Sequence, residues 1–134
     1  MTPREAVANF LAAGPYAVVG ASRDRAKFGN KVLRCYVQHG LRVHPVHPSE
    51  REIEGLACAK DLASLPERVR SLSIVTPPPI TEKIVEQAAA AGITRLWMQP
   101  GAESPAALRR AAELGLTTIA GGPCLLVELG FADA

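Results

Sequence analysis

The sequence predicts an α/β fold with three layers: a Rossmann-like, doubly wound, mainly parallel sheet of five or six strands with helices on both faces. Short apolar runs recur along the chain, and each is followed by a stretch in which apolar residues have helical spacing. The runs lack the clean polar–apolar alternation of a sheet with one wet face. Strands that alternate with helices in this way are typical of right-handed βαβ units in one sheet.

The first helix is predicted from its capping signals. Thr2 can act as the N-cap, Pro3 suits the first turn, and Glu5 completes a capping box. Gly14 and Pro15 then end the helix, because glycine favours a helix C-terminus and proline cannot continue one.

The remaining elements alternate between strand and helix. Strands are expected at residues 16–19, 42–46, 72–75, 94–98 and 116–120, with a shorter one at 56–58. Helices are expected at residues 29–38 and 80–91, after the Ser104-Pro105 start signal, and at 124–129, with a helical turn near Leu62. Gly40, Gly92 and Gly115 end the three long helices.

The composition indicates a single globular domain, residues 1–134. Of the 134 residues, 48% are hydrophobic and 21% are charged, which excludes a disordered chain. This is the ordinary size of one domain, so we expect no separate catalytic domain. A net charge of +2 and an aromatic content of 4% do not indicate a nucleic-acid-binding surface.

Targeting signals and cysteines are consistent with a cytoplasmic protein. No apolar run reaches the roughly 18 residues of a membrane span. The first residues have a helical pattern that includes Glu5, unlike a signal peptide. Cys35, Cys58 and Cys124 are too widely spaced to suggest a disulfide framework or a zinc site. We therefore expect no metal ion and no membrane partner.

The most informative segment is the loop after the first predicted strand, which runs from Gly20 to Asn30. In doubly wound sheets, ligands bind beyond the carboxyl ends of the strands, where the strand order reverses. Gly20 allows a sharp turn and a close backbone approach, and the following helix start favours an anion. The loop adds a hydroxyl and three positive charges that suit phosphate groups, at Ser22, Arg23, Arg25 and Lys27. A phosphate-bearing ligand is therefore predicted, the alternative being a loop of solvated charges.

The loop does not have the pattern of an NAD-binding fingerprint. The second and third glycines of GxGxxG are missing. The second strand ends in His44-Pro-Val-His-Pro48, without the acidic residue that binds the ribose of NAD. A nucleotide with an additional phosphate fits better, and an NADP-binding enzyme or redox sensor remains the alternative function.

Six motifs carry a more specific signal: Val18-Val-Gly-Ala-Ser22, Phe28-Gly-Asn30, Val43-His-Pro-Val-His-Pro48, Glu54-Gly55, Thr76-Pro-Pro-Pro79 and Leu96-Trp-Met-Gln99. In this order, and over about residues 12 to 130, they resemble the small stand-alone coenzyme A-binding proteins. That family shares its fold with the N-terminal domain of the succinyl-CoA synthetase α subunit. The resemblance implies coenzyme A, or a short acyl-CoA, as the small-molecule ligand.

The resemblance also assigns contacts to individual residues. It implies phosphate contacts from Gly20, Ala21, Ser22 and Arg23, and closure of the loop over the ligand by Lys27, Phe28, Gly29 and Asn30. It implies an adenosine side lined by Val46, His47 and Pro48, and an edge for the rest of the ligand formed by Thr76, Pro77, Met98, Gln99 and Pro100. The family commonly has Val-Asn-Pro followed by a base where this chain has Val46-His-Pro-Ser49. The partner of the 3′-phosphate therefore stays open among Arg51, Arg23 and Lys27.

The sequence shows no catalytic constellation. His39 is expected to be structural at a helix end, His44 to be an exposed strand-end residue, and His47 to be near adenine. Cys124 follows the last strand on the ligand side, where it is either a small packing residue or a reactive thiol. In the related synthetase, the phosphorylated histidine belongs to a second domain and the nucleotide site to another subunit. We therefore expect a carrier, sensor or regulatory module without its own reaction, and an interaction module with an empty pocket is a further alternative.

Overall fold

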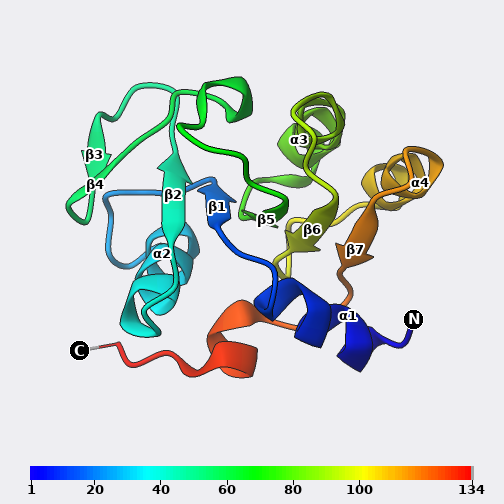
Figure 1. The fold of residues 1–134 in the computed structure, drawn as a ribbon, viewed down its shortest axis with the longest axis horizontal. Coiled ribbons are helices and arrows are strands. Elements are labelled where there is room, and N and C mark those ends of the chain that lie inside the picture. The colour runs from blue at the N-terminus through cyan, green and yellow to red at the C-terminus, as the bar shows by residue number, and fades with distance from the viewer. Residues whose placement is uncertain (134) are drawn as a thin grey trace.

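The computed structural model describes residues 1–133 and confirms the predicted fold class (Figure 1). A five-stranded sheet has the order β2-β1-β5-β6-β7, and every neighbouring pair is parallel. Its strands are β1 (Tyr16–Val19), β2 (Val43–Val46), β5 (Ser71–Ile74), β6 (Arg95–Met98) and β7 (Thr117–Ile119).

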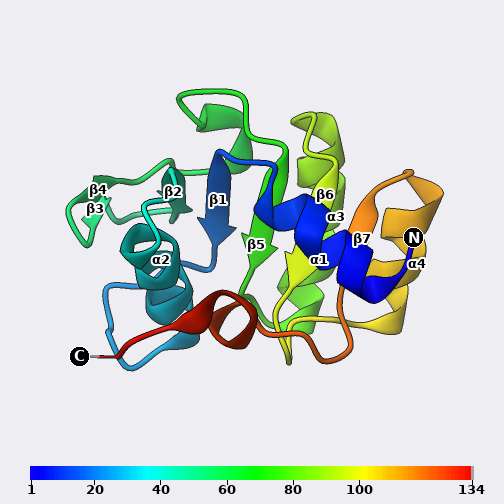
Figure 2. The ribbon, with the colours of Figure 1, turned by 60° about the horizontal axis from the view of Figure 1, so that its bottom comes forward.

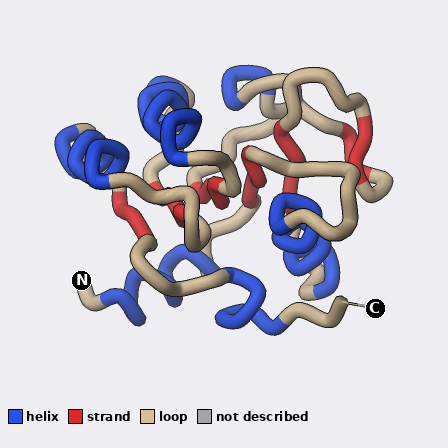
Figure 3. The backbone as a smooth tube through the Cα atoms, turned by 180° about the vertical axis from the view of Figure 1, so that it is seen from behind, coloured by secondary structure: helices blue, strands red, loops and turns tan. Residues whose placement is uncertain are grey.

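Helices cover both faces of this sheet (Figures 2 and 3). One face is covered by α3 and α4, and the other by α1, α2 and the π-helical turn η2. The bounds are α1 (Pro3–Leu11), α2 (Phe28–Gln38), η1 (Leu62–Ser64), α3 (Pro78–Ala90), α4 (Pro105–Glu113) and η2 (Leu126–Gly130). Among residues 1–133, no helix has the length and apolar character that crossing a bilayer requires.

The capping box predicted for α1 is present. The Thr2 hydroxyl oxygen accepts a hydrogen bond from the Glu5 backbone N–H at 3.1 Å. The Glu5 carboxylate in turn accepts one from the Thr2 backbone N–H at 2.9 Å. These bonds satisfy two donors that the start of a helix would otherwise leave free.

The segment after β2 differs from the prediction. The short strand expected at 56–58 is the second half of a separate antiparallel hairpin, formed by β3 (Glu52–Ile53) and β4 (Leu56–Ala57). Glu54 and Gly55 both have positive φ, 52° and 78°, as a two-residue hairpin turn requires. Two-residue strands carry too little periodicity for the sequence to reveal. The strand at residues 16–19 is found as predicted, and the other strand and helix ends differ from expectation by at most two residues.

Alternate residues of each strand point into two separate cores. Ala17 and Val19 of β1 pack beneath α3, whereas Tyr16 and Val18 pack beneath α1 and α2. All four are buried, which explains why this strand lacks polar alternation.

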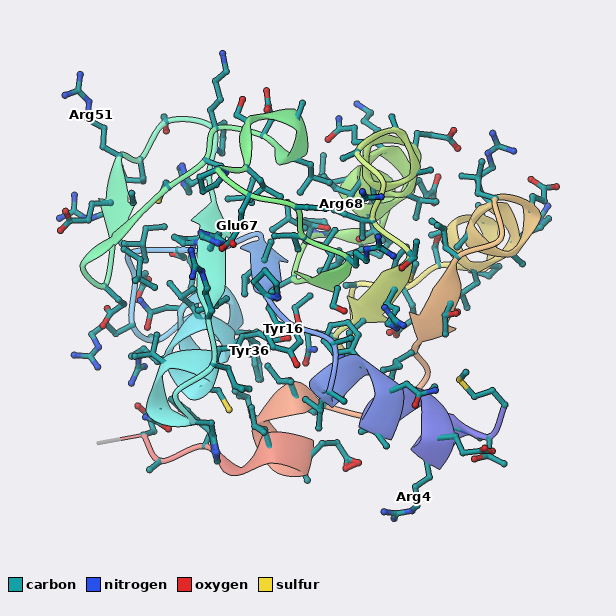
Figure 4. All side chains as sticks on the ribbon, viewed as in Figure 1. Arg4, Tyr16, Tyr36, Arg51, Glu67 and Arg68 are labelled. Carbon is teal, nitrogen blue, oxygen red and sulfur yellow. The ribbon has the colours of Figure 1, made fainter. Side chains whose placement is uncertain are left out.

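The central strand β5 also carries two buried serines, and each has a partner. The Tyr36 hydroxyl and the Ser73 hydroxyl are 2.6 Å apart, and the Ser71 hydroxyl donates to the Ala13 carbonyl at 2.8 Å. Tyr36 also stacks on Tyr16, with ring centroids 4.7 Å apart (Figure 4). Burial raises the pKa of Tyr36, so its hydroxyl stays neutral in this core.

Tyr36→Phe should lower the free energy of unfolding by about 1–3 kcal/mol, because it leaves the buried Ser73 hydroxyl without its partner. Urea denaturation measures this loss. Tyr36→Phe/Ser73→Ala removes both polar groups and should recover part of the stability. A double variant no more stable than the single one would contradict the hydrogen bond's assigned role.

Candidate functional site

The sheet order reverses between β1 and β5, because the chain runs from β1 outward to β2 and then returns to the other side of β1. The loop after β1 leads to α2 on one face, and the loop after β5 leads to α3 on the other. These diverging connections leave a crevice at the carboxyl ends of the strands, where ligands of such sheets bind.

A cleft of about 410 Å³ lies at this point. It brings together several of the residues assigned from the sequence: Gly20, Ala21, Val46, His47, Pro48 and Thr76. Three side chains that sequence analysis did not assign add an apolar wall: Leu62, Ile80 and Ile84. The cleft is therefore lined by apolar side chains together with loop backbone and polar groups.

The polar groups include Lys60 and Asp61, which sequence analysis also missed. The Ala59 backbone N–H donates to the Pro45 carbonyl at 3.0 Å, and the His47 N–H donates to the Ala59 carbonyl at 2.9 Å. These bonds extend the edge of β2 and place Lys60 beside the cleft. No local sequence pattern predicts the bridge between Val46 and Ala59, since the two residues are not neighbours in the sequence.

The ring of His47 is oriented by its own turn. Its Nδ1 atom accepts hydrogen bonds from the backbone N–H groups of Ser49, at 3.1 Å, and Glu50, at 2.9 Å. In the neutral ring the proton therefore resides on Nε2. His47 can accordingly donate a hydrogen bond to an acceptor in the cleft.

Two glycines allow close backbone contacts around the β1 loop, one with the segment after β5 and one with the start of α2. Gly20 has φ +88°, and a Cβ added there would lie 2.0 Å from the Val75 carbonyl oxygen. A Cβ on Gly29 would lie 1.9 Å from the Gly20 carbonyl oxygen. Both distances are far below any real contact, so the start of α2 and the end of β1 can meet only through glycines.

A buried polar network holds the loop from below. Asn30 is fully buried, and its side-chain amide donates to the Ser22 carbonyl at 2.9 Å and to the Glu54 carboxylate at 3.1 Å. Its oxygen accepts from Arg34 Nε at 2.6 Å, and Arg34 also donates to the Arg25 carbonyl at 3.0 Å. Asn30 therefore positions the loop, and its assignment as a direct ligand contact is not supported by its burial.

The three cations of the loop are not equivalent. Arg23 Nε lies 3.2 Å from Glu50 Oε2, and Arg25 Nε lies 3.7 Å from Glu54 Oε2. Both pairs are exposed, so they are weak and can be exchanged for a phosphate. Lys27 forms no ion pair within residues 1–133.

Lys27 is also the N-cap of α2, and its side chain does not cap the helix. The first N–H groups of α2 therefore point toward the loop without a side-chain partner in residues 1–133, as an anion site requires. Phe28 beside them is 59% exposed, an unusual position for a large apolar side chain.

The remaining assigned residues lie outside the cleft. Met98 is fully buried in the core beneath α3 and α4, which contradicts its assignment as a ligand contact. Gln99 is 2% exposed, whereas Pro77 and Pro100 are exposed beyond β5 and β6. Arg51, at the start of the β3–β4 hairpin, is exposed and points away from the molecule (Figure 4). Its orientation therefore does not favour Arg51 as the partner of the 3′-phosphate.

The other histidines have structural partners. His39 Nε2 contacts the Gly130 carbonyl, in agreement with a structural role at the end of α2. His44 is only 16% exposed and pairs with Glu67, so the expectation of an exposed residue was wrong. The hydrogen bond from His44, followed by that from Arg42, lowers the pKa of Glu67. These contacts explain the positions of both imidazole rings without a catalytic role.

Two cysteines are poorly suited to reaction. Burial raises the pKa of Cys35 to about 11 and also raises that of Cys58, so both stay protonated near neutral pH. Within residues 1–133, no group of His, Cys, Asp and Glu side chains is arranged to hold a metal ion.

The fold and the cleft are those of a Rossmann-like α/β domain, and the comparisons with known proteins specify its family. The family model described as a CoA binding domain matches residues 15–130. The chain therefore belongs to this CoA-binding domain family, as its motifs predicted.

Curated relatives are acetate–CoA ligases of the ADP-forming type. The chain is 35% identical over 71 residues to ligase I of Archaeoglobus fulgidus, which is 53% of this chain and 10% of the ligase. It is 35% identical over 72 residues to the ligase II α subunit of Pyrococcus furiosus, which is 53% of this chain and 15% of that subunit. The similarity thus covers a small part of each ligase.

Similar solved structures include chains of nearly the same extent. A conserved hypothetical protein of Pyrococcus furiosus is 39% identical with a TM-score of 0.79, over 84% of this chain and 97% of that one. A hypothetical protein of Pyrococcus horikoshii OT3 is 27% identical with a TM-score of 0.88, over 96% and 89%. A Thermus thermophilus protein is 29% identical with a TM-score of 0.85, over 96% of each chain.

Proposed function

We propose that this chain binds coenzyme A, or a short acyl-CoA, in the cleft between the β1 and β5 loops. We further propose that it serves as a cytoplasmic carrier, sensor or regulatory module and does not itself carry out the ligase reaction of its relatives. The observation that carries the proposal is the cleft itself, which is lined by Lys60, His47 and several apolar side chains. The start of α2 packs against Gly20 at its edge and has no side-chain cap.

The chemistry of the cleft matches the adenosine end of the ligand. The apolar wall of Leu62, Ile80 and Ile84 suits the face of an adenine ring. The first turn of α2 and Lys27 suit the diphosphate, because backbone donors and a cation converge there. The Asp61 carboxylate caps η1 through one oxygen, at 2.9 Å from the Ser64 N–H, and lies where a ribose hydroxyl can donate to it.

Lys60 replaces Arg51 as the proposed partner of the 3′-phosphate. It lines the cleft on the adenosine side, next to His47, and has no ion-pair partner within residues 1–133. Arg23 already pairs with Glu50, and Lys27 lies at the start of α2 on the diphosphate side. A charge-assisted contact from an unpaired cation stabilises a bound phosphate more than one that must first leave a carboxylate.

Lys60→Gln should weaken coenzyme A binding by roughly 10- to 100-fold, the effect of one lost charge-assisted contact. Dephospho-coenzyme A, which lacks the 3′-phosphate, should bind the variant and the wild type equally. Lys83→Gln, on the exposed surface of α3, is the matched control and should change neither affinity. Isothermal titration calorimetry measures all of these. An equal loss for both ligands would show that Lys60 contacts another part of the ligand.

Calorimetry of the wild-type protein tests the function itself. Coenzyme A should give saturable heat and raise the melting temperature, and NADPH should not displace it. The absence of both heat and thermal shift at millimolar coenzyme A would overturn the proposal. Displacement by NADPH at similar concentration would favour the alternative function instead.

A further inference from the structure

A short segment after η2 lies along one side of α2. We call this segment, residues 131–133, the strap, and Figures 1 and 2 show it in red running past α2. The Gln38 side chain holds the strap through both terminal atoms: Nε2 donates to the Ala132 carbonyl at 2.6 Å, and Oε1 accepts from the Ala132 N–H at 3.1 Å. Just before the strap, the Gly130 carbonyl contacts His39 Nε2. The strap is therefore fixed to the C-terminal end of α2.

The far end of the strap pairs with charges nearer the start of α2. The Asp133 carboxylate accepts a hydrogen bond from Arg34 Nη1 at 3.2 Å, and its other oxygen lies 3.4 Å from Lys31 Nζ. The Arg34 guanidinium also lies over the Phe131 ring, 5.0 Å from the ring centroid. Because the Arg34 side chain is only 8% exposed, Asp133 compensates a charge that would otherwise be costly to bury.

Arg34 connects the strap to the loop after β1. Its Nε donates to Asn30 Oδ1 at 2.6 Å, and its Nη2 donates to the Arg25 carbonyl at 3.0 Å, whereas Nη1 binds Asp133. The guanidinium is planar and rigid, so its three nitrogens cannot move independently. The positions of Asn30 and of the Arg25 carbonyl therefore depend on whether the strap is docked on α2.

The strap can leave α2 without unfolding the domain. Ala132 and Asp133 are exposed, and Phe131 is only partly buried at the margin of the core. The contacts of the strap with α2 include hydrogen bonds and ion pairs at the surface, which are individually weak. Segments with few buried contacts open at a small cost in free energy. The docked and released strap therefore form a two-state element that a bound ligand can bias.

We propose that the strap is a latch that regulates the coenzyme A site. The docked strap fixes Arg34 and thereby holds the loop after β1 in its ligand-binding position. When the strap is released, the loop loses this support and the affinity for coenzyme A falls. This inference rests on the proposed function and adds a means of regulating it. Because coupling between two sites is reciprocal, bound coenzyme A must favour the docked strap as much as the docked strap favours coenzyme A.

Gln38→Ala tests the latch without altering Arg34 or the ligand loop. It removes the two hydrogen bonds to the Ala132 backbone and should release the strap. Calorimetry should then show a coenzyme A affinity lower by about fivefold or more, the lower end of typical coupling between sites. In the ¹⁵N spectrum of the free variant, the Arg25 amide signal should also shift, which a purely local effect at Gln38 would not produce.

Asp133→Ala tests the latch from its other end. It should lower the affinity for coenzyme A by a similar factor, and Asp133→Glu should retain most of the affinity. The direction is informative, because coenzyme A is anionic and the loss of a carboxylate by charge alone would raise the affinity. Asn9→Ala, exposed on α1, is the control and should leave the affinity unchanged.

Hydrogen exchange measures the reciprocal effect. Saturating coenzyme A should slow the exchange of the Ala132 N–H by about the factor that Gln38→Ala costs in affinity. If the wild type binds coenzyme A but neither Gln38→Ala nor Asp133→Ala binds it more weakly, or if Ala132 exchange is unchanged, the latch alone is overturned. If the wild type does not bind coenzyme A, the proposed function and the latch are both overturned.

Discussion

Replacement of Gly20 by alanine is expected to lower the free energy of unfolding by about 3–5 kcal/mol and to eliminate coenzyme A binding. Two costs add at this residue. Its φ of +88° is unfavourable for any side chain, and the new Cβ would lie 2.0 Å from the Val75 carbonyl oxygen. Relief of this overlap requires β1 and the β5 loop to separate, which would open the cleft between them.

Gly40→Ala separates these two costs. Gly40 also has a positive φ, +67°, but a Cβ there would meet nothing within 4 Å. We therefore expect a loss of only about 1–2 kcal/mol, the cost of the backbone conformation alone. Urea denaturation of both variants measures the difference. Equal losses would contradict the backbone contact between Gly20 and Val75.

Asn30→Ala should have the second largest effect, a loss of about 2–4 kcal/mol in the free energy of unfolding. It removes the amide that joins the Ser22 carbonyl, the Glu54 carboxylate and Arg34. The Ser22 carbonyl would lose this donor, and Glu54 and Arg34 would each lose one of their contacts. The loop would lose its support, so coenzyme A affinity should fall as well, although Asn30 is buried beneath the loop.

The control for Asn30 is Asn9→Ala, since Asn9 is exposed on α1 and should tolerate the change. Asn30→Asp is more informative, because it retains the acceptor for Arg34 and places a second carboxylate beside Glu54. Denaturation and calorimetry should show that Asp is nearly as damaging as Ala. Unchanged coenzyme A affinity in both Asn30 variants would contradict a supporting role for the network.

The fold was predictable because its signals are local. The apolar run of β1, the capping box at Thr2 and Glu5, and the glycines after the helices each determine a short segment. The β3–β4 hairpin was not predicted because its two-residue strands are too short to show a periodic pattern. The partial burial of His44 was not predictable because its partner, Glu67, lies 23 residues further along the chain.

The site was predictable in part, for the same physical reason. The β1 loop could be located from Gly20 and its cations, and the residues after β2 from their motif. Lys60 could not be found, because only the bridge between Ala59 and Val46 brings it to the cleft. The burial of Met98 likewise depends on which face of β6 meets α3 and α4, which a short strand ending in three apolar residues does not reveal.

The two sets of relatives differ in how much of their length this chain covers. The match to the acetate–CoA ligases spans 10–15% of their lengths, whereas the Pyrococcus furiosus and Thermus thermophilus structures are covered to 97% and 96%. On the proposed function, we expect affinity for coenzyme A to come from the first turn of α2 and from Lys60.

The central claim concerns where coenzyme A binds, and an NMR titration of the ¹⁵N-labelled protein tests it most directly. A second cavity, of about 460 Å³, provides a competing location along α1, lined in part by Pro3, Val7 and Glu128. Coenzyme A should shift the amide signals of Gly20 to Gly29, His47, Lys60 and Thr76, and leave those of α1 unchanged. Shifts confined to α1 and η2, or no shifts at millimolar coenzyme A, would contradict the account.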